Sequence, residues 1–440
     1  MRYGCVMAML FSMCASRVWA WSDHASLLWP VVNSLPSMSA ASVRAESLED
    51  FVTAQAPAIQ RALQAHERWT SEQGMVYALT PKVLKFDLTA EDLRRAFLES
   101  IRVNPTLGYE LYLQGIQGLA HESQTDTSLT WSDLSFLESG TSHESVRYER
   151  IAPGAVVSPA QVMATANDEP DMGMDVGLFS NNGTAYGARY GFGEQPFGNP
   201  NLSYGSQAPF HMGFYHLDWL TRTAQPSLLK TYPMWRIVLY DRLAQVAFKT
   251  GHPYWGWRFM GWAMHYLGDL TQPYHALPLP GVSTVDALWL VVRGETDAAV
   301  QKVSNRHGVL ESYQYQRLVT SLSDAVLGAP FLPVLMAGTP EPESTDVQAF
   351  VMALTEMSVG ASASLDATLA TQVPARFVND PGFEWVGSGE EPSIVSAVQS
   401  TGGEAAVTYL DQAVIVQLKR FSGVARAWIA RAQSHLQANQ

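Results

Sequence analysis

The residues best suited to chemistry lie in one short segment, His265-Tyr-Leu-Gly-Asp269-Leu-Thr-Gln-Pro273-Tyr-His275. His265 and Asp269 are four residues apart, so a helix would place both side chains on one face. Pro273 cannot continue that helix, and the resulting turn allows His275 to return to the same side. Imidazoles and carboxylates at such spacing suit zinc. A buried histidine–aspartate pair beside an unrelated turn histidine would have the same spacing, so support is needed from elsewhere.

Two further segments offer ligands of the same types. His307 and Glu311 again stand four residues apart, although exposed pairs of this kind are common on helices. Trp21-Ser-Asp-His24 is the expected start of the mature chain. There, a free amino group and its own carbonyl could chelate a metal ion, and His24 lies close enough to contribute.

Residues 1–20 have the pattern of a signal peptide. Arg2 supplies the positive charge, an apolar run extends from Cys5 to Ala15, and Val18-Trp-Ala20 has small residues at the cleavage positions. A lipoprotein leader is the alternative, because Leu10-Phe-Ser-Met-Cys14 loosely resembles a lipidation box. No later apolar run reaches about 18 residues. We therefore expect a secreted protein, extracellular or periplasmic.

The composition restricts the chemistry. The chain has 440 residues, 47% of them hydrophobic and 16% charged, as in a globular protein with a large core. Both cysteines, Cys5 and Cys14, lie in the leader, so a mature chain would have neither disulfides nor a thiolate nucleophile. Loss of the leader would change the net charge from -13 to -15, because it removes Arg2 and Arg17. This charge disfavours electrostatic binding of nucleic acid or anionic lipid.

Helical periodicity dominates the sequence, so we predict an all-α fold. A capping-box-like Thr89-Ala-Glu-Asp92 marks one helix start, and residues 257–272 read as a nearly all-apolar core helix. Strand signals are sparse. The other expected helices cover residues 47–69, 234–249, 345–371 and 404–436.

Two kinds of connection divide the chain. Residues 169–207 are rich in Gly, Asn, Tyr and Phe and read as a long inserted loop. Polar, turn-rich segments at 338–344 and 380–400 follow later. We expect a catalytic domain over 21–337 and a helical extension over 338–440 that packs on the same domain.

Aromatic residues of the inserted loop have two interpretations. They could form an apolar rim for a membrane surface or a choline group, or they could pin the loop to the protein body. These residues are Phe179, Tyr186, Tyr190, Phe192, Phe197 and Tyr204.

The run HYLGDLTQPYHA, residues 265–276, closely resembles the HYLGD-x-x-QP-x-HA signature of the bacterial zinc-dependent phospholipases C. Single-strand-specific nucleases of fungi and plants share that fold and a related motif. The resemblance implies a mostly helical domain with three zinc ions. It also implies that a tryptophan at the mature N-terminus is itself a ligand, here Trp21 through its amino nitrogen and carbonyl oxygen. His24 would be the histidine at that ion.

The same resemblance assigns the central residues. Asp269 would bridge two zinc ions, and His265 would bind one of that pair. His275 would bind the remaining ion, whose site His307 and Glu311 would complete. The nucleases tend to carry aspartate at the position of Glu311, so this residue favours a phospholipase.

Two more ligands are expected upstream of the motif. Asp168 is the first choice for an aspartate, with Asp171 as the alternative, and Asp168 would also orient or deprotonate the attacking water. His211 is the first choice for a histidine, with His216 as the alternative. The inserted loop explains the long separation between the two ligands.

The resemblance therefore implies a monomeric zinc phospholipase C that cleaves phosphatidylcholine or a related lipid to diacylglycerol and a phosphorylated head group. Its partner would be the phospholipid membrane surface, and no nucleic acid is expected. Glu169 stands where choline-preferring relatives carry an aromatic residue, which argues against choline specificity. The alternatives are a zinc-dependent single-strand nuclease of the same fold, and a non-catalytic zinc-binding protein associated with membranes.

Overall fold

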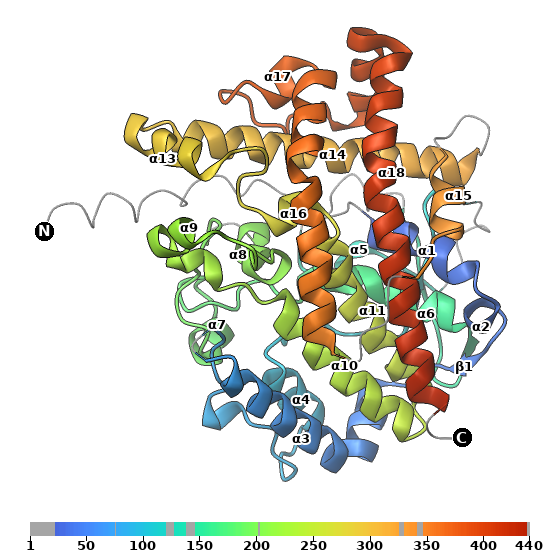
Figure 1. The fold of residues 1–440 in the computed structure, drawn as a ribbon. Coiled ribbons are helices and arrows are strands. Elements are labelled where there is room, and N and C mark those ends of the chain that lie inside the picture. Colours follow the sequence, from blue (N-terminus) through green and yellow to red (C-terminus); the bar gives the residue numbers. More distant parts are fainter. Residues whose placement is uncertain are drawn as a thin grey trace, which may run out of the picture.

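The computed structural model describes residues 23–74, 76–119, 127–137, 146–200, 203–324, 330–340 and 346–437. Most of these residues are helical, which confirms the predicted all-α fold (Figure 1). None of the described helices is long and apolar enough to cross a membrane. Trp21 lies outside the described residues.

The α-helices of the described residues follow one another as α1 (His24–Asn33), α2 (Pro36–Ser39), α3 (Leu48–Glu72), α4 (Leu93–Ser100), α5 (Trp131–Leu134), α6 (Pro159–Asp168), α7 (Ala185–Tyr190), α8 (Ser203–His211), α9 (Trp219–Ala224), α10 (Pro233–Lys249), α11 (Pro253–Leu270), α12 (Pro273–Ala276), α13 (Thr284–Arg293), α14 (Thr296–Ser323), α15 (Phe331–Met336), α16 (Val347–Gln372), α17 (Ala375–Val378) and α18 (Ile394–Gln437). Short 3₁₀ turns are η2 (Lys82–Leu84), η3 (Glu169–Met172), η4 (Pro226–Leu229) and η5 (Glu391–Ser393).

Strands play a small part in the fold. β1 (Val43–Arg44) pairs antiparallel with β5 (Val156–Val157). β4 (Tyr148–Arg150) lies between β2 (Tyr112–Gln114) and β3 (Ser128–Leu129), and both pairings are antiparallel.

Helix α11 is the centre of the core. Every residue from Tyr254 to Leu270 is buried, which requires neighbours on all sides of the helix. Contacts with α6, α10, α16 and α18 supply them. Gly261 permits the close approach of α6, because a Cβ at this position would lie 2.6 Å from the Cβ of Ala166 and 2.8 Å from the carbonyl oxygen of Met163. A side chain at Gly261 would therefore push apart α11, which carries His265 and Asp269, and α6, which ends at Asp168.

Local sequence signals explain most helix ends, although some observed ends differ from the predicted ones. Ser47 caps α3 by accepting a hydrogen bond from the amide of Asp50. The helix predicted from Thr89 begins instead at Leu93, because the Thr89 hydroxyl donates to Asp87 and Asp92 caps α4. α18 bends at Gly403, whose φ of 65° only glycine adopts readily, so the part that follows confirms the helix predicted over 404–436 and an additional helical part precedes it.

The C-terminal helices pack directly on the core. α16 and α18 lie side by side in Figure 1, and each also contacts α10 and α11. α18 further contacts α1, and α16 contacts α12. Helices far apart in sequence therefore surround the segment that carries the central motif.

Candidate metal centre

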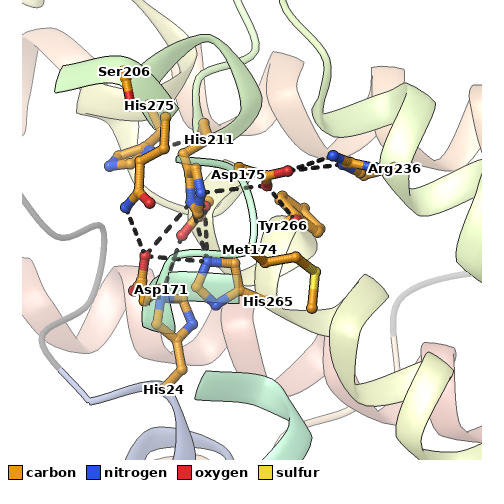
Figure 2. A network of polar contacts seen from close by, with 12 residues as sticks. His24, Asp171, Met174, Asp175, Ser206, His211, Arg236, His265, Tyr266 and His275 are labelled. Carbon is orange, nitrogen blue, oxygen red and sulfur yellow. Dashed lines mark hydrogen bonds and ion pairs between the residues drawn. The ribbon is translucent and has the colours of Figure 1, made fainter. Parts of the chain in front are cut away.

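The centre is built around the end of α11 and the turn that follows it. His265 and Asp269 are fully buried and four residues apart on one helix, as predicted. α11 ends at Leu270, and Pro273 opens α12, which carries His275. Figure 2 shows that His275 and His265 both lie close to His211. The chain thus returns to the same side, as the position of the proline indicated.

The first group comprises His211, His265 and Asp269. His211 Nδ1 lies 2.9 Å from Asp269 Oδ2 and 3.1 Å from His265 Nε2. His265 Nε2 lies 3.6 Å from the same carboxylate oxygen. α8 ends at His211, so two helices bring these side chains together.

The second group shares His265 and adds His24 and Asp171. His24 Nε2 lies 3.8 Å from Asp171 Oδ2 and 3.3 Å from Asp269 Oδ1. His265 Nε2 lies 3.7 Å from Asp171 Oδ1. Asp269 therefore stands between His24 and His211, as a bridging carboxylate would.

The third group comprises His275, His307 and Glu311. His307 Nε2 lies 3.0 Å from His275 Nε2 and 2.8 Å from Glu311 Oε1. His275 Nδ1 donates a hydrogen bond of 2.7 Å to the backbone carbonyl of His211. His211 consequently joins this group to the first one through its own backbone.

Hydrogen bonds to backbone carbonyls determine which ring nitrogen of His265 and of His275 has a free lone pair. His265 Nδ1 lies 2.8 Å from the carbonyl oxygen of Asn167, and His275 Nδ1 contacts that of His211. A carbonyl oxygen only accepts, so both Nδ1 atoms carry the proton. Both Nε2 lone pairs therefore face the groups, ready to act as metal ligands.

The groups fit metal ions in geometry and in chemistry. Ligands at 2.0–2.1 Å from a tetrahedral zinc ion stand about 3.3 Å from one another, and the separations above run from 2.8 to 3.8 Å. Buried atoms in the centre also lack hydrogen-bond partners, namely both ring nitrogens of His24 and Oδ1 of Asp269. Unpaired buried polar atoms are costly unless a cation or water satisfies them. Three buried clusters could thus hold metal ions.

Burial determines the protonation state of the five histidines in the three groups. It lowers the pKa of His307 to about 3. Burial also keeps the pKa of the other four well below the usual value, with further lowering by neighbouring histidines; these are His24, His211, His265 and His275. All five are neutral at pH 7, which is the form that binds metals.

The pKa values of the carboxylates in the centre shift in the opposite direction, upward. Burial raises the pKa of Asp171 and of Asp269 well above the ordinary value, and repulsion from neighbouring carboxylates adds to the effect. Several buried acids at one place indicate a site that a cation would stabilise.

The upstream aspartate in the second group is Asp171, so the first choice, Asp168, does not match the geometry. Asp168 Oδ1 accepts hydrogen bonds from the backbone amides of His24 at 2.7 Å and of Ala25 at 3.2 Å. Its other oxygen accepts from the side chain of Gln114. Asp168 thus anchors the first turn of α1 and positions His24. The 3₁₀ turn η3 places Asp171, one turn later, beside His265.

The other upstream choice agrees with the geometry. His211 belongs to the first group, whereas His216 lies near α16, with its Nε2 2.9 Å from the hydroxyl oxygen of Thr355 and 3.1 Å from the carbonyl of Met352. Sequence reasoning missed Gln207, which donates to Asp171 Oδ1 at 3.2 Å. Its position four residues before His211, on the same helix, was the available signal.

The inserted segment is better ordered than a loop, and it contains η3 and α7. Its described aromatic side chains pack inward. Phe179 and Phe192 contact Phe210 and Tyr232, and the Tyr190 hydroxyl donates to the carbonyl of Val103. These contacts favour the interpretation that the aromatic residues pin the segment to the body.

Glu169 also has a structural role. It is buried and forms an ion pair with Arg258 at 2.6 Å, and it accepts a hydrogen bond from the indole of Trp262.

Comparison of the chain with protein-family models, curated proteins and solved structures gave no match.

Proposed function

We propose that this protein is an exported, zinc-dependent phospholipase C that holds three zinc ions in the centre described above. The observation that carries the proposal is the meeting of three buried histidine–carboxylate groups at one place. His265 belongs to two of them, and Asp269 of the first group also lies 3.3 Å from His24 of the second. Imidazole and carboxylate ligands suit zinc.

Charge explains why such a centre would take a phosphodiester. The chain has a net charge of -13, which repels anions at long range. Asp171, Asp269 and Glu311 offset three of the six positive charges of three zinc ions, which leaves roughly +3 in the centre by formal count. The bound ions would therefore create the local positive charge that a phosphate group requires.

One carboxylate of the centre would direct the reaction. Asp171 is buried close to His24 and His265. Zinc, when bound, stabilises the charge that develops on the phosphate in the transition state. Asp171 is the carboxylate best placed to orient and deprotonate an attacking water, and Gln207 holds one of its oxygens.

An exposed apolar face supports a lipid substrate. No residue of α13 is buried, and the side chains of Val285, Trp289 and Val292 are 62%, 54% and 73% exposed. α9, whose Trp219 is also exposed, lines an apolar pocket together with α13. α13 begins at Thr284, shortly after His275 in sequence. Exposed tryptophans suit the interface of a bilayer.

Parallel assays would test the proposal. The zinc-loaded protein is expected to release a phosphorylated head group from phosphatidylcholine and to leave single-stranded DNA intact. A His265→Ala variant should lose this activity. Release of nucleotides without head-group release would instead identify a nuclease of the same fold.

The apolar face can be tested with matched variants. Trp289→Ala with Val292→Ser should slow cleavage of lipid vesicles while cleavage of a soluble short-chain phospholipid is retained. The control is Tyr409→Ala with Val416→Ser, since both side chains are exposed on α18. Equal loss on both substrates would contradict a membrane-contacting role for α13.

A further inference from the structure

His211 has carboxylates near both of its ring nitrogens, and Figure 2 shows Asp175 beside it. Its Nδ1 faces the first metal group and lies 2.9 Å from Asp269. Its Nε2 points the other way, toward Asp175 Oδ2 at 3.6 Å. This separation slightly exceeds a hydrogen bond. The Nε2 atom is buried and has no hydrogen-bond partner, so Asp175 is the acceptor that faces it.

Asp175 is held rigidly in the core. Its Oδ1 accepts hydrogen bonds from Arg236 Nε at 3.0 Å and from the terminal Nη2 at 2.5 Å, and its Oδ2 accepts from the Tyr266 hydroxyl at 2.5 Å. Arg236 also donates to the backbone carbonyls of Ile101 and Arg102 at 2.7 and 2.8 Å. Asp175 and Arg236 are 0% exposed. Such bonds fix the position of the carboxylate and favour its charged form.

Asp175 distinguishes His211 from its neighbours in the centre. The outer nitrogens of His265 and His275 donate to backbone carbonyls, those of Asn167 and His211. A carbonyl orients a ring, whereas a carboxylate also increases the basicity of the opposite nitrogen.

We propose that Asp175 is the positioning residue for His211: it accepts the Nε2 proton when Nδ1 binds a metal ion, and so strengthens that bond. The inference rests on the metal-binding part of the proposed function. Asp175 contacts the first group only at the outer nitrogen of His211, so its effect passes through the His211 ring. Arg236 and Tyr266 act one step further out, because they hold the Asp175 carboxylate in place.

The variant Asp175→Asn separates this role from packing. Arg236 is a donor only, so the amide oxygen must stay at the Oδ1 position, and the amide nitrogen then takes the Oδ2 position. There the NH₂ group would face the Nε2 proton of metal-bound His211, donor against donor. The matched control is Asp411→Asn, because Asp411 likewise accepts from an arginine and from the hydroxyl of Tyr313 but has no histidine paired with it among the described residues.

The test measures zinc affinity by competition with a chromophoric chelator, without reference to activity. Asp175→Asn should bind one of three zinc ions roughly 10- to 100-fold more weakly, while Asp411→Asn binds all three as the wild type does. Unchanged affinities in Asp175→Asn would overturn the inference. A wild type that binds three zinc ions but cleaves no diester would contradict the proposed function alone.

A second measurement needs no substitution at position 175. In the zinc-loaded wild type, the ring N–H of His211 should give a hydrogen-bonded proton signal that exchanges slowly with water. Its assignment comes from its absence in His211→Asn. A His211 N–H that exchanges as fast as the ring protons of exposed histidines would overturn the inference, even if Asp175→Asn failed to fold.

Discussion

Acid should destabilise the metal-free protein through His307, a member of the third group. Burial lowers the pKa of this histidine to about 3 in the folded protein, whereas an unfolded chain returns it to about 6.5. As the pH falls below 6.5, the unfolded state therefore binds a proton that the folded state does not. The stability contribution of His307 is fully present above pH 6.5 and is lost progressively down to about pH 3.

The size of the effect follows from these two pKa values. The loss approaches about 1.4 kcal/mol per pH unit, and integration from pH 7 to pH 5 gives about 2 kcal/mol. The exact folded value matters little in this window, because a pKa near 3 lies far below pH 5. His307→Gln removes the titrating group, so the difference in unfolding free energy between wild type and variant should shift by about 2 kcal/mol against the wild type.

Urea unfolding of the chelator-treated proteins would measure this difference. The internal control is the interval from pH 8 to pH 7, over which the difference should change by only about 0.1 kcal/mol. A difference that is the same at pH 5 and pH 7 would refute the reasoning. His307 would then titrate equally in both states, and burial could not be keeping its nitrogen free for a metal ion.

Three more predictions concern the acidic residues and the N-terminus. Glu169→Gln should lower the unfolding free energy in urea by about 3–5 kcal/mol, because Arg258 would be left charged and buried, with zinc content retained. Asp171→Asn should lower the zinc content measured by mass spectrometry, whereas Asp168→Asn should retain the zinc ions of the other groups and weaken only the one near α1. Extra residues ahead of Trp21 should remove one zinc ion from the centre, and three ions with normal activity in such a protein would show that Trp21 is not a ligand.

Short-range sequence patterns were sufficient to predict the part of the centre that begins at His265. His265 and Asp269 share a helical face because of their spacing, and Pro273 dictates the turn that returns His275. The His307–Glu311 step also lies on one helix, α14. In each case the deciding interaction spans only a few residues, so the sequence contains it directly.

The upstream half depends on tertiary contacts. The choice between Asp168 and Asp171 is decided by the backbone amides at the start of α1, which are 143 and 144 residues away in sequence. The choice between His211 and His216 is decided by α16, which binds His216 from more than 130 residues away. The role of Asp175 follows only from its tertiary contacts with Arg236 and the ring of His211. The periodicity of a sequence does not predict such contacts.

Zinc content of the protein cleaved before Trp21 tests the central claim most directly. Elemental analysis, with anomalous scattering at the zinc edge to locate the ions, is expected to give three zinc ions per chain. The ions should lie among His24, Asp171, His211, His265, Asp269, His275, His307 and Glu311. A correctly processed, folded protein that binds no zinc at these residues would contradict the claim.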